Sequence, residues 1–200
     1  MKRRDFLRFG VSKAAEAVVE VAGIKHRDVA VSWIRPPFAL AEAEFLQACT
    51  RCDLCIEACP HNVIFKLRPH VGLMAQGTPA LDLTARGCHL CEDWPCVTVC
   101  EPKALALSGL SDSDEEVELP NPDKLAVVTI NEETCLPYSG PECGACAGSC
   151  PVPDALTWEG STKPVIDQAL CVGCAMCREA CIVDPKAVDL ALVSLEVDAP

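Results

Sequence analysis

The spacing of the cysteines constrains this chain more than any other feature. Its 200 residues include 16 cysteines, which fall into four groups of four with none left over. The groups, in chain order, are Cys49, Cys52, Cys55 and Cys59; Cys88, Cys91, Cys96 and Cys100; Cys135, Cys143, Cys146 and Cys150; and Cys171, Cys174, Cys177 and Cys181. Aromatic residues make up only 4% of the chain, so an ordinary hydrophobic core would be thin. We therefore expect the fold to depend on what the cysteines bind.

Three kinds of cysteine chemistry compete to explain these groups. Disulfide scaffolds use spread-out cysteines to join distant loops, and structural zinc sites usually take two separated C-x2-C pairs. The first and fourth groups instead follow C-x2-C-x2-C-x3-C. This spacing is typical of [4Fe–4S] clusters, in which three thiolates of one loop bind one cluster and the fourth binds its neighbour. All sixteen cysteines are therefore candidate ligands of four [4Fe–4S] clusters.

The second and third groups are less regular and leave an alternative open. The residues EDWP separate Cys91 from Cys96, and LPYSGPE separates Cys135 from Cys143. The prolines and the glycine in these gaps predict looser loops. Fewer than four clusters, or zinc at one of these two groups, is the remaining alternative.

The segments that follow the cysteine groups form an internal repeat. They read CPHNVIF, CEPKALAL, CPVPDALTW and CIVDPKAVDLAL, each a cysteine with a proline nearby, a helical turn and a short apolar run. The segments LAVVTINEETC (125–135) and KPVIDQALC (163–171) predict strands that lead into cysteine loops. A strand, a cysteine loop, a short helix and a strand make half of a bacterial ferredoxin domain. We predict an α+β fold of dicluster ferredoxin-like modules, with short strands and helices around four cubane clusters.

The repeat also predicts how the chain is divided. Residues 33–108 carry the first and second cysteine groups, and residues 124–200 carry the third and fourth. Residues 109–123 read as an acidic linker, and residues 61–87 have no clear pattern and are predicted to form an irregular loop. The repeat leaves the pairing of the groups open. Neighbouring groups could pair, or the chain could be nested, with the first group paired to the fourth and the second to the third.

Three segments resemble the ferredoxin-type proteins NapF, NapG and MauM. They are IRPPFALAEAEFLQACTRCDLCIEACP (34–60), GCHLCEDWPCVTVC (87–100) and TCLPYSGPECGACAGSCP (134–151). The resemblance covers roughly residues 33–195, and the Arg35–Pro36–Pro37 run before the first group makes it specific. It implies four [4Fe–4S] clusters in a fold like the beta subunits of the dimethyl sulfoxide reductase group, in which the pairing is nested.

The resemblance thus implies one ligand set for each cluster. The four sets are Cys49, Cys52, Cys55 and Cys181; Cys171, Cys174, Cys177 and Cys59; Cys88, Cys91, Cys96 and Cys150; and Cys135, Cys143, Cys146 and Cys100.

The N-terminal residues 1–32 give conflicting signals about location. KRRDFLRFG (2–10) looks like a twin-arginine export motif, but charged residues interrupt the apolar run that a signal peptide needs. Apolar residues recur there at helical spacing, so we predict an amphipathic helix that packs on the body or on a partner. We expect the protein to be cytoplasmic. The alternatives are periplasmic, through twin-arginine export, or attached to a membrane surface through the basic residues of the motif.

The remaining features favour an electron carrier over an enzyme. The net charge of −12 argues against nucleic acid as a partner, and no apolar stretch is long enough to span a membrane, so membrane association would need a partner. No dinucleotide-binding motif and no nucleophile with a base is found. We predict a protein that passes single electrons between donor and acceptor oxidoreductases, one of which could contain molybdenum. The alternatives are a NapF-like maturation factor for a molybdenum-containing reductase and a zinc-bound adaptor. We expect His61 and His89, each beside a cysteine group, to face solvent.

Overall fold

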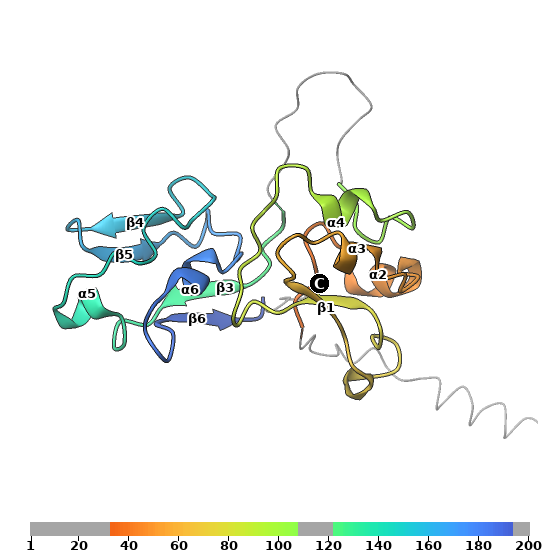
Figure 1. Ribbon diagram of the computed structural model, residues 1–200, viewed down its shortest axis with the longest axis horizontal. Helices are drawn as coiled ribbons and strands as arrows, with labels where there is room; N and C mark the ends of the chain where they lie inside the picture. The colour runs from red at the N-terminus through yellow and green to blue at the C-terminus, as the bar shows by residue number, and fades with distance from the viewer. Residues whose placement is uncertain (1–32, 108–121, 194–200) are drawn as a thin grey trace, which may run out of the picture. The chain divides into compact units, whose positions relative to one another are not determined.

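The computed structural model describes residues 33–107 and 122–193 (Figure 1). The predicted N-terminal helix and most of the predicted acidic linker lie outside these residues. Within the two described ranges, no helix is both long enough and apolar enough to cross a membrane. We call residues 33–107 the first module and residues 122–193 the second module.

The first module is built from short elements that alternate with the cysteine loops. Its helices and strands are α2 (Glu42–Ala48), α3 (Leu54–Glu57), β1 (Ile64–Lys66), the 3-10 helix η1 (Pro69–Val71), β2 (Pro79–Leu81) and α4 (Pro95–Thr98). Helix α3 lies inside the first cysteine group and α4 inside the second. The short helices therefore end just before the last cysteine of each group, whereas the repeat predicts a helical turn after it.

The second module repeats this plan with longer strands. Its elements are β3 (Val127–Ile130), α5 (Leu136–Ser139), β4 (Leu156–Glu159), β5 (Lys163–Ile166), α6 (Met176–Ala180) and β6 (Val188–Ala191). The strands predicted from 125–135 and 163–171 are confirmed as β3 and β5, and the apolar runs after the third and fourth groups form β4 and β6.

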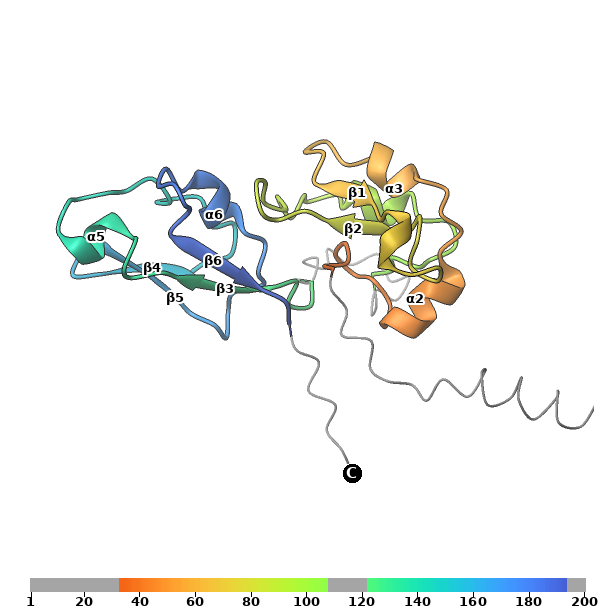
Figure 2. The ribbon, with the colours of Figure 1, turned by 90° about the horizontal axis from the view of Figure 1, so that it is seen from below.

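All strand pairs of the described residues form within one module or the other. In the second module, β3 pairs antiparallel with β6, and β4 pairs antiparallel with β5 (Figures 1 and 2). In the first module, β1 pairs antiparallel with β2, and the bridge between Ala39 and Leu105 takes the place of the β3–β6 pair. In both modules the outer segments pair with each other and the inner strands pair with each other. Neighbouring cysteine groups therefore belong to the same module.

The prediction that residues 61–87 form an irregular loop is wrong in part. This segment contains β1 and β2, whose register pairs Ile64 with Leu81 and Lys66 with Pro79. A bridge from Ile34 to Leu81 adds a further pairing at the edge of β2. The apolar run of CPHNVIF (59–65) predicts a strand where β1 forms, but the three residues of β2 are too few to show the alternation by which a strand is recognised in a sequence.

Arg35 ties the beginning of the first module to its interior. Its guanidinium pairs with Glu42 at 2.6 Å and donates hydrogen bonds to Thr78 Oγ1 and to the Pro79 carbonyl. It also lies over the ring of Phe45, 4.4 Å from the ring centroid, which adds a cation–π contact. Arg35 of the Arg-Pro-Pro run therefore anchors α2 to β2.

The two modules meet through backbone and side-chain hydrogen bonds between residues 84–88 and 174–179. The Cys88 N–H donates to the Cys174 carbonyl at 2.7 Å, and the Gly87 N–H donates to Glu179 Oε2 at 2.7 Å. A Cβ added to Gly87 would lie 2.7 Å from the Met176 backbone nitrogen, so only glycine allows this close approach. The contact brings the second and fourth cysteine groups together.

Candidate metal centre

The sixteen thiols gather into four sites, two in each module. Site A in the first module is a cavity of about 20 Å³ whose lining includes Cys49, Cys52, Cys55 and Cys100. Site C in the second module is a cavity of the same size whose lining includes Cys135, Cys143, Cys146 and Cys181. In each, three cysteines come from one group and the last comes from the neighbouring group.

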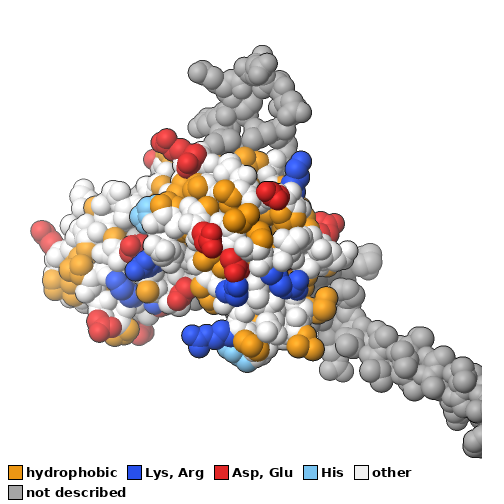
Figure 3. Space-filling model, turned by 45° about the vertical axis from the view of Figure 1, so that its right-hand side comes forward, with side chains coloured by type: hydrophobic (Ala, Val, Ile, Leu, Met, Phe, Trp, Pro, Cys, Tyr) orange, Lys and Arg blue, Asp and Glu red, His pale blue; other side chains and the backbone are white. Residues whose placement is uncertain are grey.

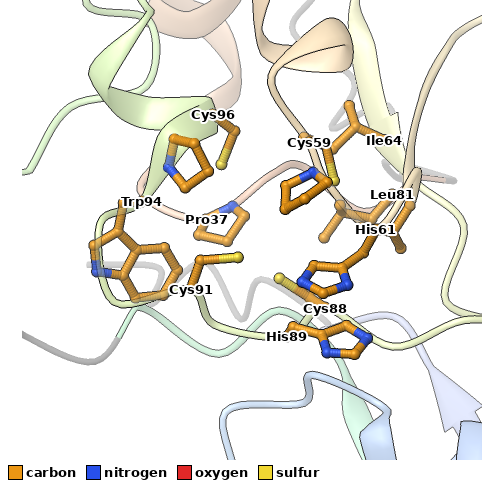
Figure 4. Close-up of a pocket in the computed structure, with 13 residues that line it drawn as sticks. Pro37, Cys59, His61, Ile64, Leu81, Cys88, His89, Cys91, Trp94 and Cys96 are labelled. Carbon is orange, nitrogen blue, oxygen red and sulfur yellow. The ribbon is translucent and has the colours of Figure 1, made fainter.

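Site B shows the arrangement in detail. Its cavity, also about 20 Å³, is lined by Cys59, Cys88, Cys91 and Cys96, whose sulfur atoms point toward a common space (Figure 4). The rest of the lining is mostly apolar, including Trp94, which packs edge-on against Phe38 with ring centroids 4.8 Å apart. A cluster in this cavity would be shielded from water on most sides.

Site D is defined by the electrostatic surroundings of its thiols. Burial, followed by the nearby thiols of Cys174, Cys171, Cys146 and Cys150, raises the pKa of Cys177 to about 12. Burial likewise raises the pKa of Cys174 to about 12, with Cys150 and Cys171 among its neighbours. Site D therefore consists of Cys171, Cys174 and Cys177 with Cys150 from the third group.

The same physical causes act in the first module. Burial raises the pKa of Cys55 to about 12, and the thiol of Cys100 is the next largest cause. Burial also raises the pKa of Cys96 to about 12, followed by the effects of Cys88 and Cys59. Such thiols do not ionise alone near neutral pH. They become thiolates when a metal centre supplies compensating positive charge, and cluster binding would then release protons.

These sites differ from the nested sets that the resemblance implies. Cys100, and not Cys181, completes the set of Cys49, Cys52 and Cys55, and Cys181 instead completes the set of Cys135, Cys143 and Cys146. Cys59 likewise lies with Cys88, and Cys150 lies with Cys171. The physical reason is the strand pairing, which keeps neighbouring groups in the same module. The fourth cysteine of each group therefore lies with the other group of its own module.

Left-handed backbone conformations shape the cysteine loops. The residue before the second cysteine has a positive φ in three groups: Arg51 at 61°, Leu90 at 48° and Gly173 at 75°. The residue after it does so in the first and fourth groups, at Asp53 and Ala175. Alternating left- and right-handed residues turn successive N–H groups toward one side, which forms an anion-binding concavity of the kind found at Fe–S sites.

Gly173 is required for a second reason. A Cβ at this position would lie 2.0 Å from the Ala126 carbonyl oxygen, so the fourth loop can pack against the start of the second module only through glycine. Sequence reasoning missed these loop-shaping residues. These residues share only their position immediately before the second cysteine. Because that position carries Arg, Leu or Gly, no residue type marks it in the sequence.

A single metal ion and a cubane cluster need different arrangements of donors. Within residues 33–107 and 122–193, which include all sixteen cysteines, no three His, Cys, Asp or Glu side chains converge closely enough to hold one metal ion. A cubane does not need such convergence, because each thiolate binds a different iron. The thiols also receive backbone hydrogen bonds, such as Leu105 N–H to Cys100 Sγ at 3.3 Å.

The four sites follow one another in the order A, B, D, C. Cys55 of site A is among the groups that raise the pKa of Cys96 in site B. Cys88 of site B does the same for Cys174 of site D, to which it is also joined by the backbone hydrogen bond. Cys146 of site C likewise raises the pKa of Cys177 in site D.

The expectation that His61 and His89 face solvent holds only in part. Their rings stack in parallel, with centroids 3.5 Å apart, beside site B (Figure 4). His89 Nε2 also lies 3.8 Å from the Glu179 carboxylate of the second module, and both rings are half-buried. The pair therefore packs at the contact between the modules.

Comparison with known proteins identifies the family of the chain. The model of the 4Fe-4S binding domain family matches residues 46–65. The ferredoxin-type protein NapG of Escherichia coli K12 is 32% identical over 96% of this chain and 87% of its own length. The chain belongs to this ferredoxin-type family. Membership makes it a [4Fe–4S] protein of the electron-transfer class, as its cysteine spacing predicts.

Other members of the family match over much of the chain. The methylamine utilization ferredoxin-type protein MauM of Paracoccus denitrificans is 33% identical over 78% of this chain and 69% of its own length. The ferredoxin-type protein NapF of Escherichia coli K12 is 30% identical over 74% of this chain and 79% of its own length. The resemblance to NapF, NapG and MauM is thereby confirmed.

Proposed function

We propose that this protein is an electron carrier with four [4Fe–4S] clusters, one at each of the sites A, B, D and C. The observation that carries the proposal is the joining of the two modules at Cys88 and Cys174. The backbone hydrogen bond between these two ligand candidates supports the proposal, because clusters at sites B and D would then lie side by side and the two pairs of clusters would form one row. When bound, the clusters supply reversible one-electron oxidation and reduction.

The chain's own residues hold and tune these centres. The cysteine loops provide the thiolates, and the backbone N–H groups of residues such as Leu105 donate to sulfur, which stabilises the reduced, more negative state. The apolar lining of site B limits the access of water. The net charge of −12 destabilises the reduced, more negative state. Together with four thiolate ligands at each centre, this charge favours reduction potentials well below zero.

The partners we propose are redox proteins, a donor at one end of the row and an acceptor oxidoreductase at the other. A molybdenum-containing enzyme is one candidate acceptor. We propose a cytoplasmic location, which cell fractionation of the native protein and an Arg3→Lys, Arg4→Lys variant would test. Periplasmic native protein with a variant trapped inside the cell would overturn it.

Anaerobic purification followed by iron and sulfide analysis and a redox titration by electron paramagnetic resonance tests the cluster content. We expect four clusters per chain with negative potentials. A preparation that contains zinc in place of iron at one or more sites, or fewer than four clusters, would contradict the proposed number. Positive potentials for all four would contradict the tuning argument.

A role as a maturation factor makes a different prediction. Deletion of the gene would then leave the partner enzyme present but inactive, and an artificial electron donor would not restore its activity. An electron carrier predicts restoration, because the partner itself is complete.

A further inference from the structure

We propose that the solvent-exposed edge of site A is a port for electron exchange, and that the surface around it binds an electron-transfer protein with an acidic face. The inference rests on the proposed function and adds the place of contact and the chemistry of the partner. We call this surface the Cys52 patch and define it by Arg51, Lys66, Arg68, Leu73 and Met74 around Cys52.

The first observation is the exposure of one candidate ligand. All sixteen cysteines lie in the described residues, and among them Cys52 alone is exposed, while the others are buried or half-buried. Cys52 also lines the cavity of site A. A partner that contacts Cys52 would therefore approach the centre through one exposed ligand, which shortens the distance over which an electron must pass.

The second observation is that the residues on both sides of Cys52 are held by the segment between β1 and β2. Arg51 donates hydrogen bonds to the carbonyls of Met74 and Gln76, at 2.8 and 3.0 Å. On the other side of Cys52, Asp53 forms an ion pair with Lys66 of β1. The segment 67–77 is thereby fixed beside the exposed thiol.

The third observation is the apolar tip of that segment. The side chain of Leu73 is 87% exposed and that of Met74 is 67% exposed. Large apolar side chains grouped this way, with polar residues around them, are typical of interaction sites. Methionine also adapts its shape to different partners, which suits a contact that forms and dissociates repeatedly.

The positive charge of the Cys52 patch favours a partner with an acidic surface. Residues 58–81 contain no aspartate or glutamate although the chain as a whole carries a charge of −12. Asp53, beside Cys52, pairs with Lys66, so the unpaired positive charge of the patch comes from Arg51 and Arg68. Arg51 and Arg68 are exposed here. Basic, acidic and hydrophobic side chains all occur on the face drawn in Figure 3. A basic patch on an acidic body orients an approaching acidic protein, because attraction at the patch opposes repulsion elsewhere.

A protein fits these observations better than a membrane surface does. An anionic membrane would meet the acidic body over a wide area, and the few cations of the patch would not offset that repulsion. The patch also surrounds a ligand candidate, an arrangement that serves electron exchange but has no use in simple membrane attachment.

Reduction of the holoprotein by a photoreduced bacterial flavodoxin, an acidic one-electron donor, tests the proposal. The variants are Leu73→Ser with Met74→Ser, and Arg68→Glu. Leu192→Ser, an exposed apolar residue of the second module, is the matched control, and Arg68→Lys preserves the charge. We expect the second-order rate constant of the native protein to fall as salt is raised, and to fall about tenfold in both test variants at low salt.

A second readout is the affinity for oxidised flavodoxin by calorimetry, which should weaken in the same two variants and remain within twofold in both controls. Equal rates and affinities in all forms, or a native rate that rises with salt, would overturn the proposal. Loss of binding to phosphatidylglycerol vesicles in the Leu73→Ser, Met74→Ser variant with unchanged flavodoxin rates would overturn it in favour of a membrane contact.

Iron content and reduction by dithionite are measured in every variant. If clusters are absent from the native protein, the proposed function fails. If all forms contain reducible clusters but the variants react with flavodoxin like the native protein, only the assignment of the port fails.

Discussion

The two modules share one topology but differ in what fills their interiors. In the first module Phe45, Leu83 and Leu105 are large side chains with almost no exposure, and Trp94 packs beside site B. In the second module, Val128 and Pro164 are the comparable fully buried residues. The second module has more strand pairing, since β3–β6 and β4–β5 each pair four residues. The first module therefore has more of its stability in side-chain packing, and the second has more in its strands and in whatever its cysteines bind.

Removal of the clusters should produce the largest difference in stability between the two modules. We expect chelation under anaerobic conditions to abolish amide protection in β3, β4, β5 and β6 while part of the protection around Phe45 and Leu83 remains, because burial of large apolar side chains persists without metal. Hydrogen exchange followed by mass spectrometry measures this directly. Simultaneous loss of protection in both modules would show that the apolar core of the first has no independent stability.

Arg35→Ala should be the most destabilising single substitution we consider, and it acts on the first module. It leaves Glu42 without its partner and removes the cation–π contact with Phe45, in a site where the Arg35 side chain is only 10% exposed. Breaking such a pair costs about 3 kcal/mol. Denaturant unfolding of the holoprotein would measure the change. An effect below 1 kcal/mol would mean that Arg35 does not anchor α2 to β2.

Gly87→Ala should weaken the contact between the modules. The added Cβ meets the backbone of Met176, and overpacking of this kind costs roughly 2 kcal/mol. The expected signature is weaker magnetic interaction between reduced centres at sites B and D, with the full iron content retained. Gly144→Ala is the control, because a Cβ there has no atom within 4 Å. Identical spectra for the two variants would contradict the contact.

Lys66→Ala should have the smallest effect on stability. The ion pair of Lys66 with Asp53 lies at the surface, with the lysine side chain 50% exposed, and such pairs contribute less than about 1 kcal/mol. Thermal unfolding of the native and variant holoproteins provides the comparison. A larger loss would show that the pair has a structural role at the Cys52 loop.

The cysteine groups and the strands after them could be predicted from the sequence, because binding a cluster restricts the spacing of its ligand cysteines. The C-x2-C-x2-C-x3-C groups predict ligands for clusters, and the apolar runs after them predict strands. The helices α3 and α6 end just before the fourth cysteine of their groups, whereas the repeat predicts a helical turn after it. The pairing of groups could not be predicted, since spacing alone is compatible with both neighbouring and nested pairing. It is determined by contacts distant in the sequence, such as Ile130 with Val188 and Ala39 with Leu105.

The other features that sequence reasoning missed have the same origin. The stacking of His61 on His89 depends on the contact between two loops and has no local sequence pattern. The strand β2 is only three residues long and follows no cysteine group, and the segment between β1 and β2 is ordered by Arg51, which lies before β1 in the chain. Each of these requires knowledge of which segments are neighbours in space.

Mapping of reactive cysteines in two serine variants tests the central claim most directly. The anaerobically prepared Cys100→Ser and Cys181→Ser proteins would be alkylated and the modified residues identified by mass spectrometry. Pairing within each module predicts that Cys100→Ser makes Cys49, Cys52 and Cys55 reactive, and that Cys181→Ser makes Cys135, Cys143 and Cys146 reactive. The reverse result, with Cys181→Ser exposing Cys49, Cys52 and Cys55, would contradict the account and restore the nested arrangement.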